Sequence, residues 1–505
     1  MTEQRWISLE EAVALAEQRR VSGDLLGAEG LCRQVLQAHP AHAPALHLLG
    51  VVLHQRGDLP EAIDALRRAV AANGGVALYR ANLGEMCRQA GRLDDAISEA
   101  GLALALEPRN VHALNNLGIA HYDREEYDQA TECYRRAIEL RPNWAEAHSN
   151  LGNAVLALGA PAEALASYRR AIALKPDYVD AHNNLAMTLL LSGDFENGWR
   201  EFEWRRRRPG REHERAPAPE WQGESFAGKT LLVMAEEGHG DAIQFLRYLP
   251  AVGARGGKLA LAVHRPLVAL AQRLVPGAEV VALEAPRPRP DLWCPLMSLP
   301  RLFGTTLETM PAGVPYLSID PRVTERWRER LAGNGELKVG LVWSGALKYL
   351  HNARRAIAAE RLAPLFGAQG VRWFSLQVGK PAAELGRLPQ GITDLSPDLT
   401  DFTETAGAIL ALDLVISTDT AVPHLAGALA RPVWVMLAFM PDWRWMLDRE
   451  TNPWYPTMRL FRQPARGAWD DVVHRVGMEL RSVVDGRRDG LTPSVRAGSE
   501  SRILG

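Results

Sequence analysis

This sequence of 505 residues has few cysteines, a net charge close to zero and no long apolar run. The four cysteines are scattered without the short spacings of metal ligands or redox pairs, which is typical of buried thiols in a reducing compartment. A net charge of −2 gives no overall attraction to nucleic acid or to an anionic membrane. We therefore expect a cytoplasmic protein that has no nucleic-acid partner.

No apolar stretch reaches the length of about 20 residues that a bilayer-spanning helix requires. The first residues, MTEQRWISLEEA, also lack the apolar core of a signal peptide. The sequence thus predicts no membrane span. With 47% hydrophobic and 23% charged residues, a chain of this length can bury several cores, and we expect about two to four domains.

What the sequence has instead is a period of 34 residues in its first part. Asparagine carries this period at Asn82, Asn116, Asn150 and Asn184. Small residues and prolines keep it at Gly50, Gly84, Gly118 and Gly152, at Ala62, Ala96, Ala130 and Ala164, and at Pro40, Pro108, Pro142 and Pro176. Small residues let two helices approach closely, and proline ends the second helix. The pattern matches the tetratricopeptide repeat, a stacked helix–turn–helix, over roughly residues 9–205 in about six units.

The repeated asparagines predict a line of identical side chains along one surface of the solenoid. A carboxamide offers both a donor and an acceptor, so such a row can hold a peptide backbone without reading its side chains. We predict that Asn82, Asn116, Asn150 and Asn184 bind an extended polypeptide. The alternative is that asparagine at this position caps or bridges neighbouring helices.

The chain changes character after the repeats. Residues 205–220 are charged and rich in proline, which is typical of a linker. The run of four arginines at its start, Arg205–Arg208, can contact phosphates, but with four glutamates nearby it is more typical of the solvated end of a helix.

From Lys229 onward, short apolar runs alternate with helical patterns. The strands that we predict span residues 230–235, 259–263, 279–283, 338–343, 371–376, 414–417 and 433–437. Such alternation predicts parallel sheets covered on both faces, in two Rossmann-like halves that face one another across a cleft. The expected domains are a solenoid (1–208), a linker (209–227), a first half (228–320), a second half (321–482) and a disordered tail (483–505).

Ligands of open parallel sheets bind where the strands end, so the turns after the strands matter most. The first such turn reads Gly238-His239-Gly240-Asp241. Its glycines would let a ligand approach the backbone, and Asp241 would lie at the mouth of the cleft. The simpler alternative is that Asp241 only caps the helix. Ile243 occupies the third glycine position of a dinucleotide fingerprint, so a nicotinamide cofactor is not predicted.

The second turn, Trp343-Ser344-Gly345, is followed by a basic loop that contains Lys348 and Arg355. Backbone amides and mobile cations are what a diphosphate needs. We therefore predict that Ser344, Gly345, Lys348 and Arg355 bind phosphate groups. The alternative is a solvated basic loop.

The third turn, Ser417–His424, joins a buried strand to a helix. Hydroxyls and free amides at a helix N-terminus form an anion site. Asp419, Thr420 and His424 are predicted to hold sugar hydroxyls or phosphate, although Asp419 or Thr420 taken alone is a routine cap. Together, the three turns predict a nucleotide-sugar site.

Four segments carry a resemblance to known enzymes. DLVISTDTAVPHLAGAL (413–429) resembles the nucleotide-sugar motif of the family 9 glycosyltransferases, the lipopolysaccharide heptosyltransferases, and EEGHGDAIQFLRYLP (236–250) is similar to the first-strand loop of that family. With NGWREFEWRRRR (197–208) and DWRWMLDRETNPWYP (442–456), the whole arrangement resembles bacterial tetratricopeptide-repeat glycosyltransferases, some of which modify flagellin. It also parallels the O-linked N-acetylglucosamine transferases, in which a similar asparagine ladder lines the superhelix.

The resemblance implies an α-solenoid followed by an α/β module of the GT-B fold. It implies Asp241 as the catalytic base, and His239, which replaces a commonly apolar residue, is a rival base. The donor-binding residues that it implies are Arg355, Gln377, Thr420 and His424. Relatives often have a lysine after that glutamine, where this chain has Val378.

We therefore expect a glycosyltransferase that moves a sugar from a nucleotide-sugar co-substrate to a protein hydroxyl, with no other cofactor. The family implies an inverting reaction. No Asp-x-Asp pair stands at a strand end, so no metal ligands are predicted. Two alternatives stay open: a repeat scaffold whose transferase part is inactive, and a transferase that acts on a lipid-linked saccharide. The aromatic residues Trp443, Trp445, Trp454 and Tyr455 either shape the pocket or pack between the two halves.

Overall fold

The computed structural model describes residues 8–210, 216–333, 335–345, 352–486 and 490–493. Packing divides the chain into two compact units, Met1–Leu185 and Ala186–Gly505. The division falls inside a helix that both units share. The last stretch of the predicted solenoid, up to residue 208, therefore packs within the second unit.

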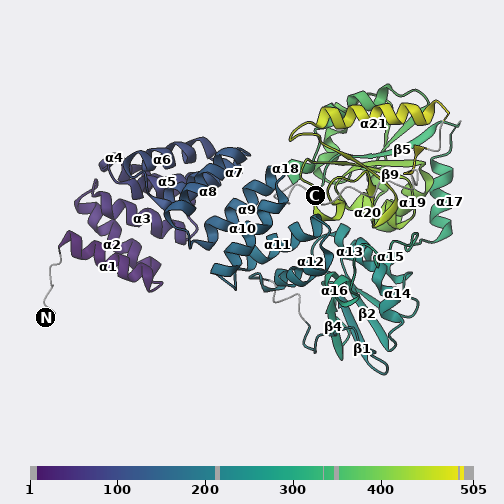
Figure 1. Ribbon diagram of the computed structural model, residues 1–505, viewed down its shortest axis with the longest axis horizontal. Helices are drawn as coiled ribbons and strands as arrows, with labels where there is room; N and C mark the ends of the chain where they lie inside the picture. Colours follow the sequence, from purple (N-terminus) through teal and green to yellow (C-terminus); the bar gives the residue numbers. More distant parts are fainter. Residues whose placement is uncertain (1–7, 211–215, 334, 346–351, 487–489, 494–505) are drawn as a thin grey trace. The chain divides into compact units, whose positions relative to one another are not determined.

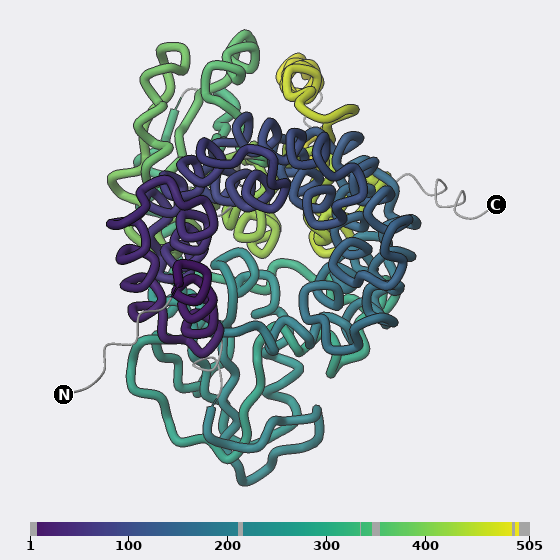
Figure 2. Tube along the Cα trace, turned by 90° about the vertical axis from the view of Figure 1, so that its left-hand side faces the viewer, coloured from purple at the N-terminus to yellow at the C-terminus, as the bar shows by residue number. Residues whose placement is uncertain are grey.

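The first unit is a solenoid of paired helices that wind in an arch (Figure 2). Its helices are α1 (Leu9–Val21), α2 (Leu25–Ala38), α3 (Ala43–Gln55), α4 (Leu59–Ala72), α5 (Ala77–Gln89), α6 (Leu93–Leu106), α7 (Val111–Asp123), α8 (Tyr127–Leu140), α9 (Ala145–Ala157), α10 (Pro161–Leu174) and α11 (Val179–Leu191). The predicted tetratricopeptide repeat is confirmed, because each repeat of 34 residues folds as one helix pair.

The repeated glycines are required by the closeness of the two helices in a pair. A Cβ on Gly118 would lie 2.6 Å from Cε1 of Tyr134, and one on Gly152 would lie 2.5 Å from Cε1 of Tyr168. Both tyrosine rings are buried, so they have no room to withdraw. The small residues thus set how closely the second helix packs against the first.

The second unit contains two sheets that are almost wholly parallel (Figure 1). The first has the order β3-β2-β1-β4, with strands β1 (Thr230–Met234), β2 (Lys258–Val263), β3 (Glu279–Ala282) and β4 (Leu292–Pro295). The second has the order β10-β11-β9-β8-β5-β6-β7, with strands β5 (Leu337–Val342), β6 (Val371–Ser375), β7 (Ile392–Asp394), β8 (Leu414–Thr418), β9 (Val433–Leu437), β10 (Thr451–Asn452) and β11 (Tyr455–Arg462). Only the short β10 pairs antiparallel among the described strands. The predicted parallel sheets are confirmed, while the Rossmann-like and GT-B assignments stay predictions.

Helices cover these sheets. The α-helices are α12 (Phe195–Phe202), α13 (His239–Phe245), α14 (Leu249–Gly253), α15 (Val268–Gln272), α16 (Leu299–Leu302), α17 (Pro321–Arg330), α18 (Asn352–Arg355), α19 (Phe402–Ala411), α20 (Ala421–Ala428) and α21 (Trp469–Val484). The 3-10 helices are η1 (Glu203–Arg207), η3 (Leu246–Tyr248), η4 (Arg265–Leu267), η5 (Leu296–Ser298), η6 (Ala359–Gly367), η7 (Lys380–Arg387), η8 (Ser396–Asp398) and η9 (Trp443–Trp445). None of the described helices combines the length and the apolar character that crossing a membrane requires.

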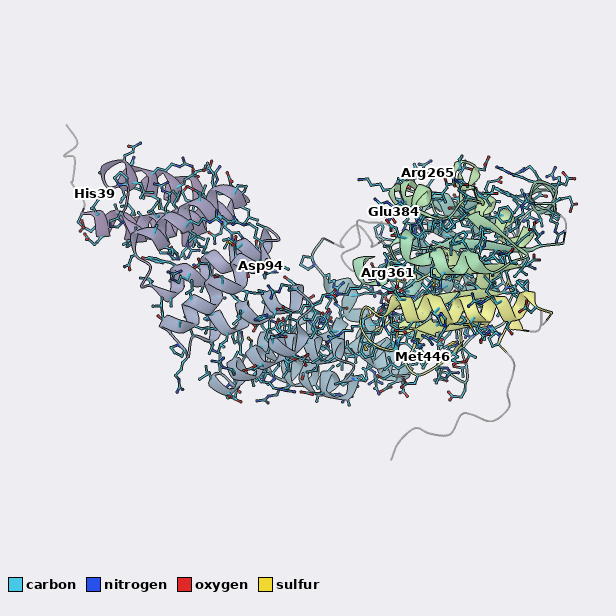
Figure 3. The ribbon with its side chains drawn as sticks, turned by 90° about the horizontal axis from the view of Figure 1, so that it is seen from above. His39, Asp94, Arg265, Arg361, Glu384 and Met446 are labelled. Carbon is cyan, nitrogen blue, oxygen red and sulfur yellow. The ribbon has the colours of Figure 1, made fainter. Side chains whose placement is uncertain are left out.

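The long helix α21, yellow in Figures 1 and 3, covers the second sheet. Its buried face presents Trp469, Val472 and Val476 to a core that includes Leu341 and Trp434 from the strands. The predicted disordered tail, 483–505, lies largely outside the described residues.

The predicted linker packs along the first sheet where it is described. The Trp221 side chain is fully buried, and its backbone amide donates to the carbonyl of Trp293 in β4 at 2.8 Å. Glu220 forms a parallel bridge with the same strand residue, so this segment extends the sheet edge. Proline and charge in a sequence indicate an irregular segment, but they do not show whether it is packed.

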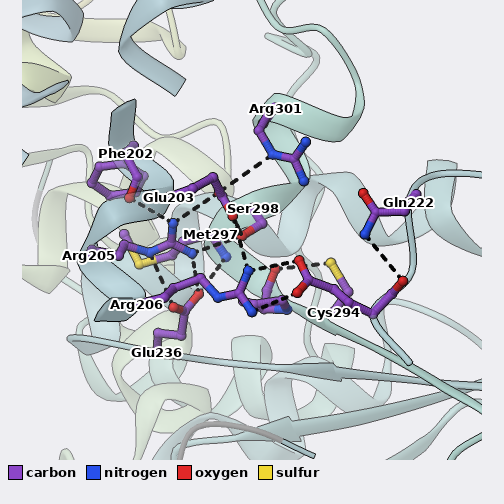
Figure 4. A network of polar contacts seen from close by, with 12 residues as sticks. Phe202, Glu203, Arg205, Arg206, Gln222, Glu236, Cys294, Met297, Ser298 and Arg301 are labelled. Atoms are coloured by element: carbon purple, nitrogen blue, oxygen red, sulfur yellow. Dashed lines mark hydrogen bonds and ion pairs between the residues drawn. The ribbon is translucent and has the colours of Figure 1, made fainter. Parts of the chain in front are cut away.

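The interpretation of Arg205–Arg208 as a solvated helix end is wrong for its first member (Figure 4). Arg205 is only 2% exposed and donates to Glu236 at 3.2 and 2.9 Å and to the Ser298 hydroxyl at 3.0 Å. Burial opposes the charged form, but the carboxylates of Glu236 and Glu203 raise the pKa of Arg205, so it stays a cation. Its charge is needed because Glu236, at the end of β1, is itself buried.

Replacing Arg205 by methionine is expected to destabilise the second unit by about 3–5 kcal/mol, because a buried carboxylate is left without its partner. Arg207→Met is the matched control: Arg207 is exposed and lies over the Trp204 ring at 4.0 Å, so its loss should cost less than about 1 kcal/mol. Urea denaturation followed by tryptophan fluorescence measures both, since only Trp6 and Trp144 precede residue 186. Equal losses in the two variants would contradict the role of the buried pair.

Candidate functional site

Two of the three predicted turns meet where α13 packs against α20 (Figure 1). Helix α13 follows β1 of the first sheet, and α20 follows β8 of the second, so each begins at the carboxyl end of a parallel strand. A Cβ on Gly240 would lie 3.0 Å from Cδ2 of His424 and 3.4 Å from Cα of Ala421. The glycine therefore allows a close approach between the two helices, and the carboxyl ends of the two sheets share one site.

Asp241 lies in the first turn of α13 and is the predicted base. Its carboxylate accepts the backbone N–H of Gly238 at 2.8 Å, so it does cap the helix. It also forms an ion pair with Arg444, which lies in η9, after β9 of the second sheet. Burial raises the pKa of Asp241, while the Arg444 guanidinium opposes that rise. The alternative that Asp241 caps the helix is thus correct. The same carboxylate also pairs with Arg444.

Arg444 is the centre of the site, and the sequence did not predict it. Besides Asp241, it donates to Asp442 through Nη1 at 2.7 Å and to the amide oxygen of Gln244 through Nε at 2.7 Å. Its side chain is 9% exposed, and the neighbouring carboxylates raise its pKa against the effect of burial. The available signal was an arginine between two tryptophans, Trp443 and Trp445, since a charge inside an apolar segment needs a buried partner.

Asp419 and Arg355 form a second charged pair, with 3.7 Å between Nη1 and Oδ2. Burial, and next the negative charge of Asp442, raise the pKa of Asp419 to about 6. Thr420 caps α20 and accepts the backbone N–H of Val422 at 3.4 Å. Asp241, Asp419 and Asp442 therefore lie around Arg444 and Arg355, with the N-terminus of α20 beside them.

The turn after β5 is held by Gln377. The amide oxygen of Gln377 accepts the backbone N–H groups of Trp343 and Ser344 at 3.1 and 2.9 Å, and its Nε2 donates to the Ser344 carbonyl at 3.0 Å. The side chain thus fixes the backbone of the predicted phosphate loop, and binding of donor by Gln377, Ser344 and Gly345 stays a prediction. Lys348 lies outside the described residues.

His239, the rival base, lies half-buried at the start of α13. Its ring packs against His264 at 4.9 Å and Phe402 at 5.2 Å between ring centroids. The assignment of His239 as a base stays a prediction.

His424 is buried in α20, where its Nδ1 contacts the Tyr455 hydroxyl at 3.1 Å. The Trp445 ring stacks on it, with 5.1 Å between centroids and 29° between planes. Burial lowers the pKa of His424 well below its usual value, and the cations Arg444, Arg247 and Arg355 lower it further. The imidazole is therefore neutral at pH 7.

Of the two roles that were left open for the aromatic segment, the structure shows packing, and shaping of a pocket stays a prediction. Trp443 packs against Trp199 of α12 at 5.2 Å and against Phe245 of α13 at 6.3 Å, so it joins elements of both sheets. Trp445 and Tyr455, in contrast, contact His424 in the site.

The asparagine row bridges successive repeats. The amide nitrogen of Asn82 contacts Nε2 of His47 at 2.8 Å, that of Asn150 donates to Asn115 at 3.0 Å, and that of Asn184 donates to Asn153 at 2.9 Å. For Asn116, the structure records no side-chain hydrogen bond to a described residue. All four residues of the row stay partly exposed. The bridging alternative is therefore correct for three of them, and peptide binding stays a prediction.

The described residues include no group of three or more histidine, cysteine or acidic side chains placed to hold a metal ion. What the site offers is chemistry by ionised groups and hydrogen bonds. Carboxylates can accept a proton, guanidinium groups can stabilise negative charge, and the neutral imidazole can hold a polar group.

Comparisons with known proteins identify the solenoid. A family model described as TPR repeat matches residues 120–159 and 157–193, and one described as Tetratricopeptide repeat matches residues 22–83. Protein FlbA of Caulobacter vibrioides is 32% identical over 324 residues, which are 58% of this chain and 53% of FlbA. The chain thus matches about half the length of that relative.

Solved structures similar to the solenoid include MamA, with 24% identity and a TM-score of 0.31 over 34% of this chain and 97% of that one. The protein TTC0263 from Thermus thermophilus has 24% identity and a TM-score of 0.32 over 36% of this chain and all of that one. The matches to the two repeat models show that the chain contains tetratricopeptide repeats.

The raised pKa of Asp419 predicts a measurable pH dependence. Between its ordinary pKa of 3.8 and about 6, the folded state keeps a proton that the unfolded state releases. This group therefore lowers the free energy of unfolding as the pH rises through that window, and the loss is complete above it. Asp419→Asn removes this contribution, so its stability should decline less than that of the wild type between pH 4 and 6.

Urea denaturation at a series of pH values measures the slope, and only the slope is compared, because the substitution also removes the pair with Arg355. Asp470→Asn, at an exposed carboxylate, should keep the wild-type slope. Parallel curves for wild type and Asp419→Asn would show that the ionisation of Asp419 is not shifted.

Proposed function

We propose that this protein transfers a sugar from a nucleotide-sugar donor to a hydroxyl group of a polypeptide held by the solenoid. The observation that carries the proposal is the meeting of α13 and α20, because it places Asp241, Arg444 and the pair Asp419–Arg355 at the carboxyl ends of two parallel sheets. Proton acceptors and cations are the two kinds of group that glycosyl transfer without a metal requires.

In this reaction, the acceptor hydroxyl loses its proton to Asp241 as its oxygen bonds to the anomeric carbon of the sugar. The bond from that carbon to the diphosphate oxygen breaks, and the electron pair leaves with the nucleoside diphosphate. Arg355 and the backbone amides at the start of α20 stabilise the leaving charge. Burial raises the pKa of Asp241, and the Arg444 guanidinium opposes that rise, so it favours the ionised form that a base requires.

The acceptor is proposed to be a polypeptide because the first unit is a solenoid of repeats with partly exposed asparagines in a row. Two of its observed hydrogen bonds use the Asn150 and Asn184 amide nitrogens, and the row still presents polar atoms to a bound backbone. Flagellin is one candidate acceptor. The alternative acceptor is a lipid-linked saccharide, and experiments on acceptor binding distinguish the two.

Asp241→Asn is expected to lower the rate of sugar transfer about 10²–10⁴-fold while leaving donor binding unchanged, because it removes the base and keeps the shape of the side chain. Glu237→Gln, at an exposed carboxylate in the same turn, should keep activity. Thermal stabilisation by a panel of nucleotide sugars measures donor binding. If no nucleotide or nucleotide sugar raises the melting temperature, the protein is a scaffold and the transferase proposal fails.

Asn116→Ala is expected to weaken binding of the acceptor polypeptide about fivefold, the effect of one lost hydrogen bond of ~1 kcal/mol, without changing the stability of the solenoid. Asn150→Ala should also destabilise the solenoid, because it breaks the bond to Asn115. Asn143→Ala, at an exposed asparagine outside the row, is the control. Fluorescence anisotropy of a labelled acceptor peptide measures binding, and unchanged affinity in both row variants would remove the row from the acceptor site.

A further inference from the structure

A continuous chain of polar contacts runs from Arg247 to His424. Arg247 donates through Nη2 to the Tyr316 hydroxyl at 3.4 Å, and the Tyr316 hydroxyl donates to the carbonyl of Ile243 at 2.9 Å. The hydroxyls of Tyr316 and Tyr455 lie 3.4 Å apart, and the Tyr455 hydroxyl lies 3.1 Å from Nδ1 of His424.

The Arg247 end of the chain limits where its protons lie. A guanidinium only donates, and a tyrosine hydroxyl has one proton to donate and two lone pairs. Because Tyr316 gives its proton to a carbonyl, it receives those of Arg247 and Tyr455. In the arrangement that uses every contact, Tyr455 donates to Tyr316, and Nδ1 of His424 carries the hydrogen that it donates to Tyr455.

Backbone carbonyls hold Arg247, the cationic end of the chain, in place. Arg247 is held by its Nε bond to the Gln244 carbonyl at 2.9 Å and by its Nη1 bonds to the carbonyls of Pro311 at 3.0 Å and Trp454 at 2.9 Å. Its guanidinium also lies 4.6 Å from the centroid of the Tyr455 ring. Arg247 is thus anchored to backbone carbonyls, which do not change protonation.

A neutral imidazole with a hydrogen on Nδ1 has a lone pair on Nε2. The edge of the ring that carries Nε2 faces the start of α13, since Nε2 lies 3.6 Å from the Cβ position of Gly240. The charged groups that act on the imidazole are Arg444, Arg247 and Arg355, and all of them disfavour a second proton. Stacking by Trp445 keeps the ring in this plane.

We propose that Tyr455 and Tyr316 hold His424 as a hydrogen-bond acceptor, and that its Nε2 receives a hydroxyl group of a substrate rather than a phosphate oxygen. A phosphate oxygen also presents lone pairs, so it has no proton to share with Nε2. The hydroxyl belongs either to the sugar of the donor or to the acceptor. This inference rests on the proposed transferase function for its substrate, while the protonation of His424 does not depend on that function.

The tautomer is measured by nitrogen-15 NMR of protein labelled at histidine, without any substrate. The signals of His424, assigned by their loss in His424→Asn, should show a protonated Nδ1 and an unprotonated Nε2. Tyr455→Phe or Tyr316→Phe should change this pattern, since each removes one hydroxyl of the chain. Tyr248→Phe is the matched control, because its buried hydroxyl bonds Thr305 at 2.7 Å outside the chain. A wild-type His424 with its hydrogen on Nε2 would overturn the proposal.

The substrate is identified by titration calorimetry of Tyr455→Phe with nucleoside diphosphates and with the matching nucleotide sugars. A loss of about tenfold in affinity for the nucleotide sugar alone, the effect of one hydrogen bond, assigns the contact to a sugar hydroxyl. Unchanged donor affinity with a raised KM for the acceptor assigns it to the acceptor hydroxyl. An equal loss for the nucleoside diphosphate would show a phosphate contact and overturn the proposal.

If the wild type binds none of these compounds, the transferase function fails and so does the substrate part of this inference. The tautomer measurement still decides whether the hydroxyl chain sets the protonation of His424. The two failures are therefore distinguishable.

Discussion

The second unit depends on the burial of one guanidinium. Arg444 lies in a segment of tryptophans, and its charge is balanced by carboxylates and an amide oxygen that come from different elements. Asp442 is its neighbour in the chain, whereas Asp241 and Gln244 belong to α13. Because a buried charge without partners is costly, the loop that carries Arg444 and the helix that carries Asp241 must stay together. The contacts that join the two sheets are thus also contacts within the candidate site.

Close packing of helices makes these contacts possible. Gly240 lets α13 reach α20, and Trp443, whose ring centroid lies 4.3 Å from the Arg444 guanidinium, packs against Phe245 and Trp199. The aromatic rings exclude water, which strengthens the interaction of Arg444 with its carboxylates. Packing and charge therefore support each other here: the apolar contacts lower the local dielectric, and the ion pair fixes the elements that make those contacts.

The sequence predicted the parts of the fold that repeat or alternate. The period of 34 residues specified the helix pairs, and apolar runs specified seven strands, because both patterns reflect local burial. It missed β4, β7, β10 and β11. The first three have only two to four residues, too few to show a period, and β11 begins inside the aromatic segment 442–456. It also misjudged Arg205, since a run of like charges looks the same whether or not Glu236 lies opposite one of them.

Site residues were predicted from the sequence only where the residues that form the turn are neighbours along the chain. The turns after β1 and β8 were found because glycine, hydroxyl and acidic residues follow strands. The partners of those residues come from far along the chain, as Arg444 does for Asp241 and Tyr455 does for His424, and no spacing in the sequence indicates them. The same limit applies to the asparagine row, whose surface position was predicted but whose bonds to His47 and Asn115 were not.

Those bonds have a consequence for how the solenoid loses its structure. In a linear array, stability is the sum of each repeat and its coupling to the next, and unfolding spreads from the ends. The side-chain bonds Asn82–His47, Asn150–Asn115 and Asn184–Asn153 add to that coupling. Among the described residues, no asparagine of the row links α1 to α3. The first repeat is joined to the second by the ion pairs Arg33–Glu61 and Arg56–Glu29 and by an apolar cluster that contains Ala16 and Leu49. The array therefore frays first at its amino-terminal pair, and the region spanned by the row opens later.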